Sequence, residues 1–215
     1  MKTQLLILAS ILLMASVATA EIVTIEFIGT VEYSQVNQGV FADVNSGDEV
    51  LATFTLDSDN WLPSPNGYGV RGYPIDQASF QLTIGSVGPV ALANPQPNGE
   101  VTYFNLRNAD PVSDGFFIAN QLEWDNLLPK LDVPGGLDPF FGFHWSVGYT
   151  EETFSSLDIM DAIGSYDYAG LTSFYTVIND AWADPIGMEF VQTNIIASTV
   201  ATEETNFGAI KAMYR

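Results

Sequence analysis

The chain has 215 residues, of which 26 are acidic and 6 are basic, so its formal net charge is −20 at neutral pH. Such a surface repels the phosphates of nucleic acids and the head groups of anionic lipids, which argues against nucleic-acid binding. With 47% hydrophobic and only 15% charged residues, the composition indicates a folded chain and not an acidic disordered one. The absence of cysteine excludes disulfides, thiol catalysis and thiolate metal sites.

The first twenty residues have the three parts of a secretory signal peptide. Lys2 supplies the positive charge, residues 5–15 form the apolar run, and Ala18–Ala20 offers the small-residue cleavage site. The rival interpretation is an uncleaved membrane anchor, but the apolar run is shorter than the roughly 20 residues that a membrane-spanning helix needs. The sequence therefore predicts export and cleavage before Glu21. We expect a secreted or extracellular protein, or one retained in the periplasm, with no membrane span after signal removal.

After residue 20, short runs of alternating hydrophobic and polar residues are separated by clusters of Gly, Pro, Asn and Asp. This pattern is typical of all-β proteins. In chain order, strands are predicted at 22–33, 49–56, 79–84, 101–107, 116–124, 140–149, 171–178 and 187–197. Gly29 predicts a bulge or a bend in the first strand. One short helix is predicted at Ser155–Ala162, with Ser155 or Ser156 as its N-cap.

Long Pro/Gly-rich loops are expected at 57–74, 85–99 and 129–139. The expected fold is an all-β, single-domain antiparallel β-sandwich, jelly-roll-like, over residues 21–197. Residues 198–215 show no strand periodicity, so they are expected to form a loosely structured tail.

Three short motifs follow one another early in the chain. They are Phe27–Val31 (FIGTV), Gly47–Val50 (GDEV) and Phe54–Asp59 (FTLDSD), and Phe80–Gly85 (FQLTIG) continues the pattern. In this order they resemble the amino-terminal part of exported bacterial proteins of the PEP-CTERM class, which an exosortase sorts and which are associated with extracellular polysaccharide. The tail at 198–215 lacks the Pro-Glu-Pro sequence and the apolar span of that class. The resemblance implies an extracellular setting and a polysaccharide partner; it carries over no catalytic residue. It also implies either that this member is released instead of anchored or that its gene has lost the sorting segment.

Asp57, Asp59 and Asn60 are the candidate metal ligands. Closely spaced carboxylate and amide oxygens are what Ca²⁺ prefers, although the spacing of an EF-hand is absent. In the alternative interpretation the same side chains cap the amides of a turn at the end of a strand. Calcium is therefore the only cofactor that the sequence suggests.

Trp61, Tyr68 and Tyr73 lie in one Pro/Gly-rich loop and are the candidate sugar-binding residues. Loops on a rigid β-scaffold commonly carry binding function, and the apolar faces of sugars stack on aromatic rings. The alternative is that the rings attach a long loop to the body of the protein. The sequence alone leaves both interpretations open.

Catalytic signals are weak. His144 is the only histidine and lies in an aromatic strand, where we expect a structural role. The acidic pairs Glu123/Asp125 and Glu151/Glu152 have the residue types of a glycosidase, but no motif accompanies them. Residues 163–167 lack the second glycine of a G-x-S-x-G turn.

Three function hypotheses follow from these signals. The first is a secreted, non-enzymatic protein of the extracellular matrix or cell surface, with extracellular polysaccharide as its partner. The second is a calcium-assisted carbohydrate-binding module, and the third is a polysaccharide hydrolase or lyase. The sequence does not indicate the oligomeric state.

Overall fold

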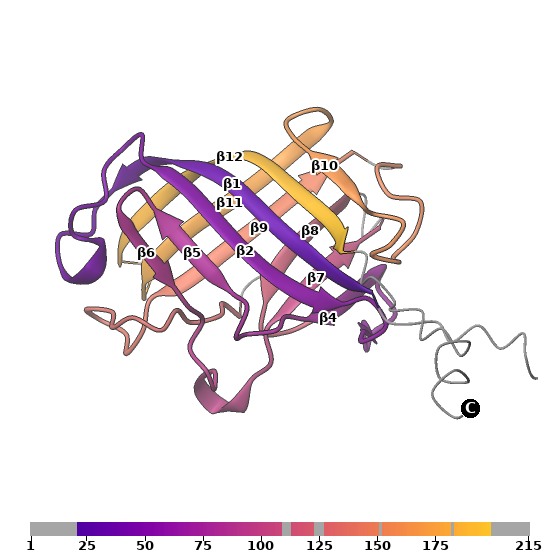
Figure 1. The fold of residues 1–215 in the computed structure, drawn as a ribbon, viewed down its shortest axis with the longest axis horizontal. Helices are drawn as coiled ribbons and strands as arrows, with labels where there is room; N and C mark the ends of the chain where they lie inside the picture. The colour runs from indigo at the N-terminus through magenta and orange to yellow at the C-terminus, as the bar shows by residue number, and fades with distance from the viewer. Residues whose placement is uncertain (1–20, 109–112, 123–126, 151, 182, 199–215) are drawn as a thin grey trace, which may run out of the picture.

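The computed structural model describes residues 21–108, 113–122, 127–150, 152–181 and 183–198, which form an antiparallel sheet (Figure 1). Its strands are β1 (Ile22–Ser34), β2 (Glu49–Asp57), β3 (Leu62–Pro63), β4 (Val70–Pro74), β5 (Gln81–Ile84), β6 (Val87–Val90), β7 (Tyr103–Arg107), β8 (Asp114–Ala119), β9 (Gly142–Tyr149), β10 (Gly164–Tyr166), β11 (Leu171–Asp180) and β12 (Ala183–Ser198). Two single 3₁₀ turns, η1 (Gly39–Phe41) and η2 (Pro97–Gly99), are the helical elements among the described residues. The predicted all-β antiparallel fold is confirmed.

The sheet runs in the order β3-β4-β7-β8-β9-β11-β12-β1-β2-β5-β6, and β10 pairs with β12. It curls so that β1, β2 and β5 lie in front of β7, β8 and β9 (Figure 1). The two layers of the sandwich therefore belong to one continuous sheet. An isolated bridge between Leu56 and Ile75 links β2 to the residue after β4 and joins the layers at one end.

Strand β1 is central because it pairs with β2 on one side and with β12 on the other. Its alternating residues Val23, Ile25 and Phe27 are fully buried, as the period-2 pattern predicts. The expected irregularity at Gly29 is confirmed, since the register of β1 against β12 shifts between Ile28 and Gly29. A side chain at Gly29 would place its Cβ 2.6 Å from the carbonyl oxygen of Glu189, so the close approach requires glycine.

The core between the layers is rich in aromatic side chains. Trp145 is fully buried, and its ring lies 5.0 Å from that of Phe27, 6.0 Å from that of Phe104 and 5.6 Å from that of Phe116. Phe27 comes from the front layer and the other three residues come from the back layer. Rings of this size dominate the apolar area that a core buries, so this cluster fixes how the layers face each other.

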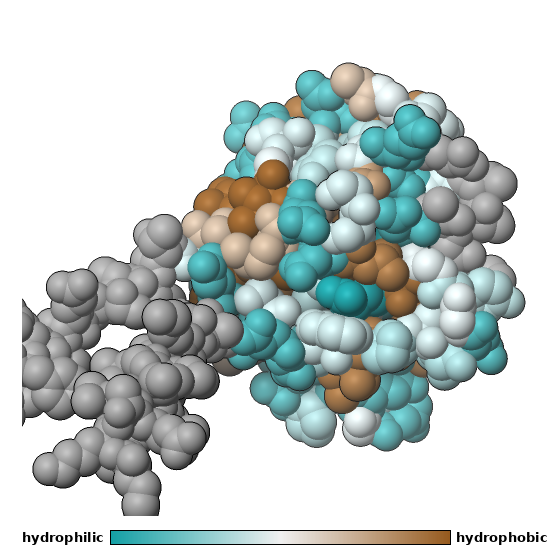
Figure 2. Space-filling view, turned by 90° about the vertical axis from the view of Figure 1, so that its right-hand side faces the viewer, coloured by the Kyte–Doolittle hydropathy of each residue, from teal (hydrophilic) through white to brown (hydrophobic). Residues whose placement is uncertain are grey.

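The face of the molecule in Figure 2 is mainly hydrophilic. Figure 2 shows one end of the molecule, where apolar side chains gather in a few patches between polar ones. The net charge of −20 agrees with a surface of this kind.

The helix predicted at Ser155–Ala162 is wrong, because this segment consists of turns and bends. The hydroxyl of Ser156 accepts a hydrogen bond from the amide of Asp158 at 2.9 Å, and the carboxylate of Asp158 accepts one from the amide of Met160 at 3.0 Å. Side chains that bond so locally to the backbone compete with helix formation. The segment is held to the core by Ile159 and Ala162, which are both buried.

Four strands were not expected: β3 and β4 lie in the predicted loop 57–74, β6 in the loop 85–99, and β10 follows the turns after residue 155. Residues 1–20, predicted as a signal peptide, and residues 199–215 of the predicted tail lie outside the described residues. In the part of the chain that the structure describes, no helix is long and apolar enough to cross a membrane.

Candidate functional site

The predicted three-ring sugar platform does not come together. Trp61 and Tyr68 are 41% and 44% exposed, but Tyr73 is fully buried in the core. The Tyr73 hydroxyl donates a hydrogen bond to the carbonyl of Leu157 at 2.8 Å and accepts one from the amide of Ile159 at 2.9 Å. Tyr73 therefore attaches the 155–162 segment to β4, and it cannot share a surface with the other two rings.

Trp61 already has a partner on one face of its ring. The guanidinium carbon of Arg71 lies 3.8 Å from the centroid of the indole, a cation–π arrangement. This contact corresponds to the interpretation in which the aromatic residues hold the loop to the body.

The predicted calcium ligands form a turn at the end of β2. One carboxylate oxygen of Asp57 accepts a hydrogen bond from the amide of Asp59 at 2.9 Å, and the amide of Asn60 donates to the carbonyl of Asp57 at 3.2 Å. This is the turn-capping arrangement that was the alternative to a metal site. Among the described residues, no three or more His, Cys, Asp or Glu side chains are grouped to hold a metal ion. Calcium binding here stays a prediction.

The residues weighed for catalysis are only partly described. Glu123, Asp125 and Glu151 lie outside the described residues, and Glu152 is exposed. His144 is buried on β9, where its ring meets the edge of Tyr175 at a centroid distance of 4.5 Å.

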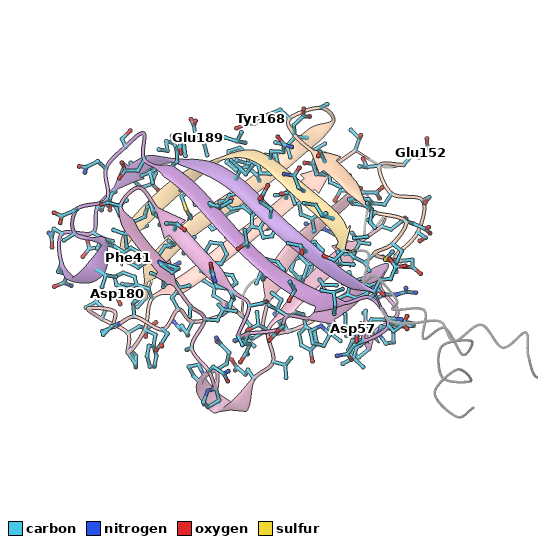
Figure 3. All side chains as sticks on the ribbon, in the orientation of Figure 1. Phe41, Asp57, Glu152, Tyr168, Asp180 and Glu189 are labelled. Atoms are coloured by element: carbon cyan, nitrogen blue, oxygen red, sulfur yellow. The ribbon has the colours of Figure 1, made fainter. Side chains whose placement is uncertain are left out.

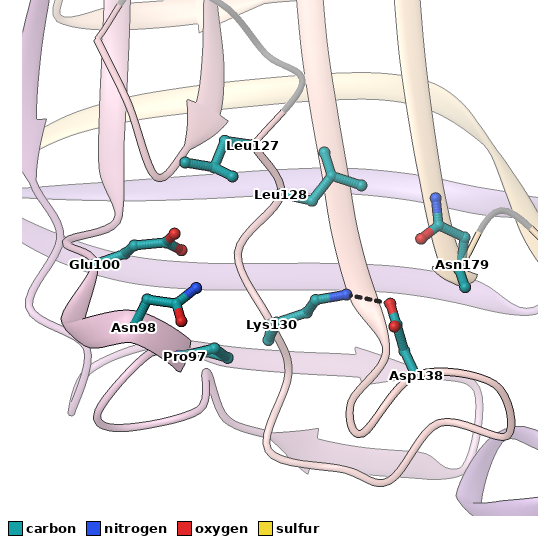
Figure 4. Close-up of a pocket in the computed structure, with 9 residues that line it drawn as sticks. Pro97, Asn98, Glu100, Leu127, Leu128, Lys130, Asp138 and Asn179 are labelled. Carbon is teal, nitrogen blue, oxygen red and sulfur yellow. Dashed lines mark hydrogen bonds and ion pairs between the residues drawn. The ribbon is translucent and has the colours of Figure 1, made fainter.

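A cavity of about 360 Å³ combines charged, amide and apolar side chains (Figure 4). It lies between η2, the segment 127–130 and the end of β11. Its polar lining consists of Asn98, Glu100, Lys130, Asp138 and Asn179, and its apolar lining consists of Pro97, Leu127, Leu128 and Ala181. None of these residues was singled out from the sequence, because they come from four separate places in the chain: 97–100, 127–130, 138 and 179–181.

The charged groups of the cavity are held by specific partners. The Lys130 ammonium lies 2.7 Å from a carboxylate oxygen of Asp138, and both side chains are partly exposed. One carboxylate oxygen of Glu100 accepts a hydrogen bond from the side-chain nitrogen of Asn120 at 2.9 Å. With one cation and two carboxylates, the lining has a formal charge of −1.

The backbone of the 130 segment is fixed against η2 by Gln96. The Gln96 amide group donates to the carbonyls of Ala93 and Lys130, each at 2.9 Å, and the Gln96 oxygen accepts from the Lys130 amide at 2.8 Å. These paired bonds resemble those between two strands, so Lys130 is positioned by backbone contacts as well as by its side chain.

The loop that carries Asp138 is anchored by Asp180 at the end of β11. The Asp180 carboxylate accepts hydrogen bonds from the amides of Gly136, Leu137 and Asp138 at 2.6, 2.5 and 2.6 Å. Burial alone would raise the pKa of Asp180, but these three donors and the Lys130 charge outweigh it and lower the pKa. Figure 3 shows Asp180 and the Asp57 turn at opposite ends of the molecule.

Asn179 adds a buried amide to the wall of the cavity. The residue is 2% exposed, and its side-chain nitrogen has no hydrogen-bond partner among the described residues. A buried donor without a partner costs about 1–3 kcal/mol, a cost that the packing around Asn179 offsets.

Taken together, the cavity offers carboxylate acceptors, ammonium and amide donors, and two leucine side chains. Small-molecule sites commonly combine apolar walls with a few fixed polar groups that orient the ligand. The arrangement suits a small ligand that has both hydroxyl groups and apolar faces.

Comparison of the chain with protein-family models, with curated proteins and with solved structures finds no match. The resemblance to PEP-CTERM proteins therefore stays a prediction.

Proposed function

We propose that this protein is an exported, non-enzymatic protein of the extracellular matrix or cell surface that binds saccharide in the cavity of Figure 4. The observation that carries the proposal is the Lys130–Asp138 ion pair in one cavity with Glu100, Asn98 and two leucine side chains. The signal-peptide pattern of residues 1–20 and the resemblance to exported proteins associated with polysaccharide support the extracellular setting.

The chemistry of the lining favours a saccharide over an ionic ligand. Each sugar hydroxyl both donates and accepts a hydrogen bond, and the cavity supplies acceptors at Glu100 and Asp138 and donors at Lys130 and Asn98. The leucine side chains offer contact to the apolar face of a sugar ring. The formal charge of −1 and the −20 of the whole chain disfavour an anionic ligand.

A binding role, and not a catalytic one, fits the state of the two carboxylates. Asp138 is neutralised by Lys130 at 2.7 Å, and Glu100 is held by Asn120. A glycosidase works with a pair of carboxyl groups that face the scissile bond, whereas here each carboxylate is already bonded to a side chain of the protein.

The test is titration of the full chain with neutral tetrasaccharides (cello-, laminari-, malto- and mannotetraose) by isothermal calorimetry. We expect at least one of them to bind, and Glu100→Gln and Lys130→Ala each to weaken that binding about tenfold, because each removes one charge-assisted hydrogen bond. The matched control is Asp43→Asn, which changes an exposed carboxylate that does not line the cavity and is expected to leave the affinity unchanged.

Two outcomes would contradict the proposal. One is that none of the sugars binds. The other is that Glu100→Gln, Lys130→Ala and the wild type bind with equal affinity. Release of reducing ends from the tetrasaccharides on incubation would contradict the non-enzymatic part alone.

A further inference from the structure

A second cavity adjoins the cavity of Figure 4. Its volume is about 380 Å³, and it is lined by the segments 75–78, 94–96 and 99–101. Glu100 lines both cavities, Asn98 lines the first and Gly99 lines the second. Figure 4 shows Asn98 and Glu100 on one side of the first cavity, with Asp138 on the other side. The residues 98–100, which we name the wall, therefore separate the two cavities by a single turn of chain.

The wall is a tight turn that leaves the space above it open. Asn98 and Gly99 both adopt left-handed backbone, with φ of 64° and 71°, and the Gly99 amide donates to the Gln96 carbonyl at 3.1 Å. A Cβ added at Gly99 would meet no atom within 4 Å apart from those of its two chain neighbours. A ligand in the first cavity can therefore continue over Gly99 into the second.

Buried amide side chains hold the wall in place. The Asn120 nitrogen donates to the Gln96 oxygen at 3.2 Å and to the Glu100 carboxylate at 2.9 Å, and the Asn120 oxygen accepts from the Thr102 hydroxyl at 2.7 Å. Gln96 lines the second cavity, and its side chain also bonds to the backbone of Lys130 in the first. One network thus fixes the two cavities relative to each other, which lowers the cost of ordering them around a shared ligand.

The opposite side of the second cavity is a turn that is fixed to β2. The Asp76 amide donates to the Thr55 carbonyl at 2.9 Å, and one Asp76 carboxylate oxygen accepts from the Ala78 amide at 3.1 Å. The Ser79 hydroxyl donates to the Asp76 carbonyl at 2.6 Å and accepts from the Thr55 amide at 2.8 Å. Gln77, which is half-buried, lines the second cavity on this turn.

The second cavity offers the same kinds of groups as the first. Gln77 and Asn94 supply amide donors and acceptors, and Val101, which is 44% exposed, supplies apolar contact. Its described lining residues include no Lys or Arg, and Asp76 and Glu100 give it a formal charge of −2. This charge disfavours an anionic sugar more strongly than the first cavity does.

Each cavity is small for a saccharide chain. Sites for drug-sized ligands are roughly 300–1,000 Å³, so cavities of about 360 and 380 Å³ have room for about two sugar units each. We infer that the two cavities form one site, and that a linear, neutral oligosaccharide of about four units crosses the wall to occupy both. The inference rests on the proposed saccharide-binding function and adds the length and the charge of the ligand.

The experiment is isothermal calorimetry of the full chain with di-, tetra- and hexasaccharides of the cello-, laminari-, malto- and manno- series. In the series that binds, we expect the tetrasaccharide to bind about tenfold more tightly than the disaccharide, because only the longer chain reaches both cavities. The hexasaccharide is expected to bind no more tightly than the tetrasaccharide. Tetragalacturonate, which carries a carboxylate on each unit, is expected not to bind.

The variant Gln77→Ala/Val101→Ala tests the second cavity. Its affinity for the tetrasaccharide is expected to fall about tenfold, while its affinity for the disaccharide stays that of the wild type. Lys130→Ala, in the first cavity, is expected to weaken the binding of both sugars. The matched control is Val40→Ala/Gln81→Ala, which changes the same residue types at exposed positions that line neither cavity. Thermal midpoints of both double variants are expected to match the wild type, since all four side chains are at least partly exposed.

The outcomes separate this inference from the proposed function. Equal affinity of the wild type for the di- and tetrasaccharide, or wild-type affinity for the tetrasaccharide in Gln77→Ala/Val101→Ala, would refute the second cavity. If Lys130→Ala still weakens binding in that case, the proposed function remains. If no tetrasaccharide binds the wild type, both fail together. Binding of tetragalacturonate as tight as that of the neutral tetrasaccharide would overturn the argument from charge.

Discussion

The anchoring of the 133–139 loop by Asp180 leads to a prediction for Asp180→Asn. An Asn side chain has nearly the same shape, but it offers one oxygen and an NH₂ group where Asp180 offers two oxygens. One of the three backbone amides, at Gly136, Leu137 or Asp138, would then face a donor instead of an acceptor.

The magnitude follows from the strength of such bonds. A hydrogen bond to a charged group contributes about 1.5–3 kcal/mol, roughly twice a neutral bond. Losing one of these bonds and the charge contribution of the other two lowers the free energy of unfolding by about 3 kcal/mol. The loop carries Asp138, so the Lys130–Asp138 pair of the cavity is also expected to loosen.

The assay is equilibrium unfolding of the wild type and Asp180→Asn in urea at neutral pH, with unchanged m-value as evidence that both unfold as one unit. The control Asp43→Asn, at an exposed position, is expected to change the free energy by less than about 0.5 kcal/mol. A loss below about 1 kcal/mol for Asp180→Asn would refute the argument that the three amide bonds hold the loop.

Three further predictions concern stability. Folding lowers the pKa of Asp180, so its contribution to the free energy of unfolding is present above the ordinary Asp pKa of about 3.9 and is lost as pH falls through the lower folded value. In urea unfolding below about pH 4, the free energy of unfolding of the wild type should therefore approach that of Asp180→Asn. Gly29→Ala should lower the free energy of unfolding by about 1–3 kcal/mol in the same assay, because the new Cβ would lie 2.6 Å from the Glu189 carbonyl oxygen. Gly164→Ala, where the nearest atom to the new Cβ is 3.7 Å away, should lower it much less. Equal losses in the two variants would contradict this argument. Tyr73→Phe removes the hydroxyl that bonds to the Leu157 carbonyl, the Ile159 amide and the Arg71 guanidinium. It should lower the thermal midpoint, with a loss of about 2 kcal/mol; an unchanged midpoint would mean that these bonds contribute nothing.

Much of the fold could be predicted because period-2 alternation is a local signal. Strand β1 is an example: Val23, Ile25 and Phe27 alternate with polar residues, and the structure buries these three. Strand β4 was missed because Gly72 and Pro74 look like loop residues, yet Gly72 has to be small, since its Cβ would lie within 2.7 Å of the Asn105 side chain.

The candidate cavity could not be predicted in the same way. Asp180 and Gly136 are 44 residues apart, and no local pattern connects a strand-ending Asp to a Gly-rich loop. The predicted aromatic platform failed at Tyr73 for a related reason, because the sequence places three rings in one segment without saying which of them faces the core. Only the pairing of distant strands decides both points.

The most direct test of the account is to locate a bound sugar on the protein. In two-dimensional ¹H–¹⁵N spectra of the full chain, the binding tetrasaccharide at millimolar concentration should shift the amide signals of Leu128, Lys130 and Asp138, which surround the cavity. Shifts at these amides that saturate with sugar concentration are the result that the account predicts. Saturable shifts confined to the Trp61 loop, or none for all four tetrasaccharides, would contradict it.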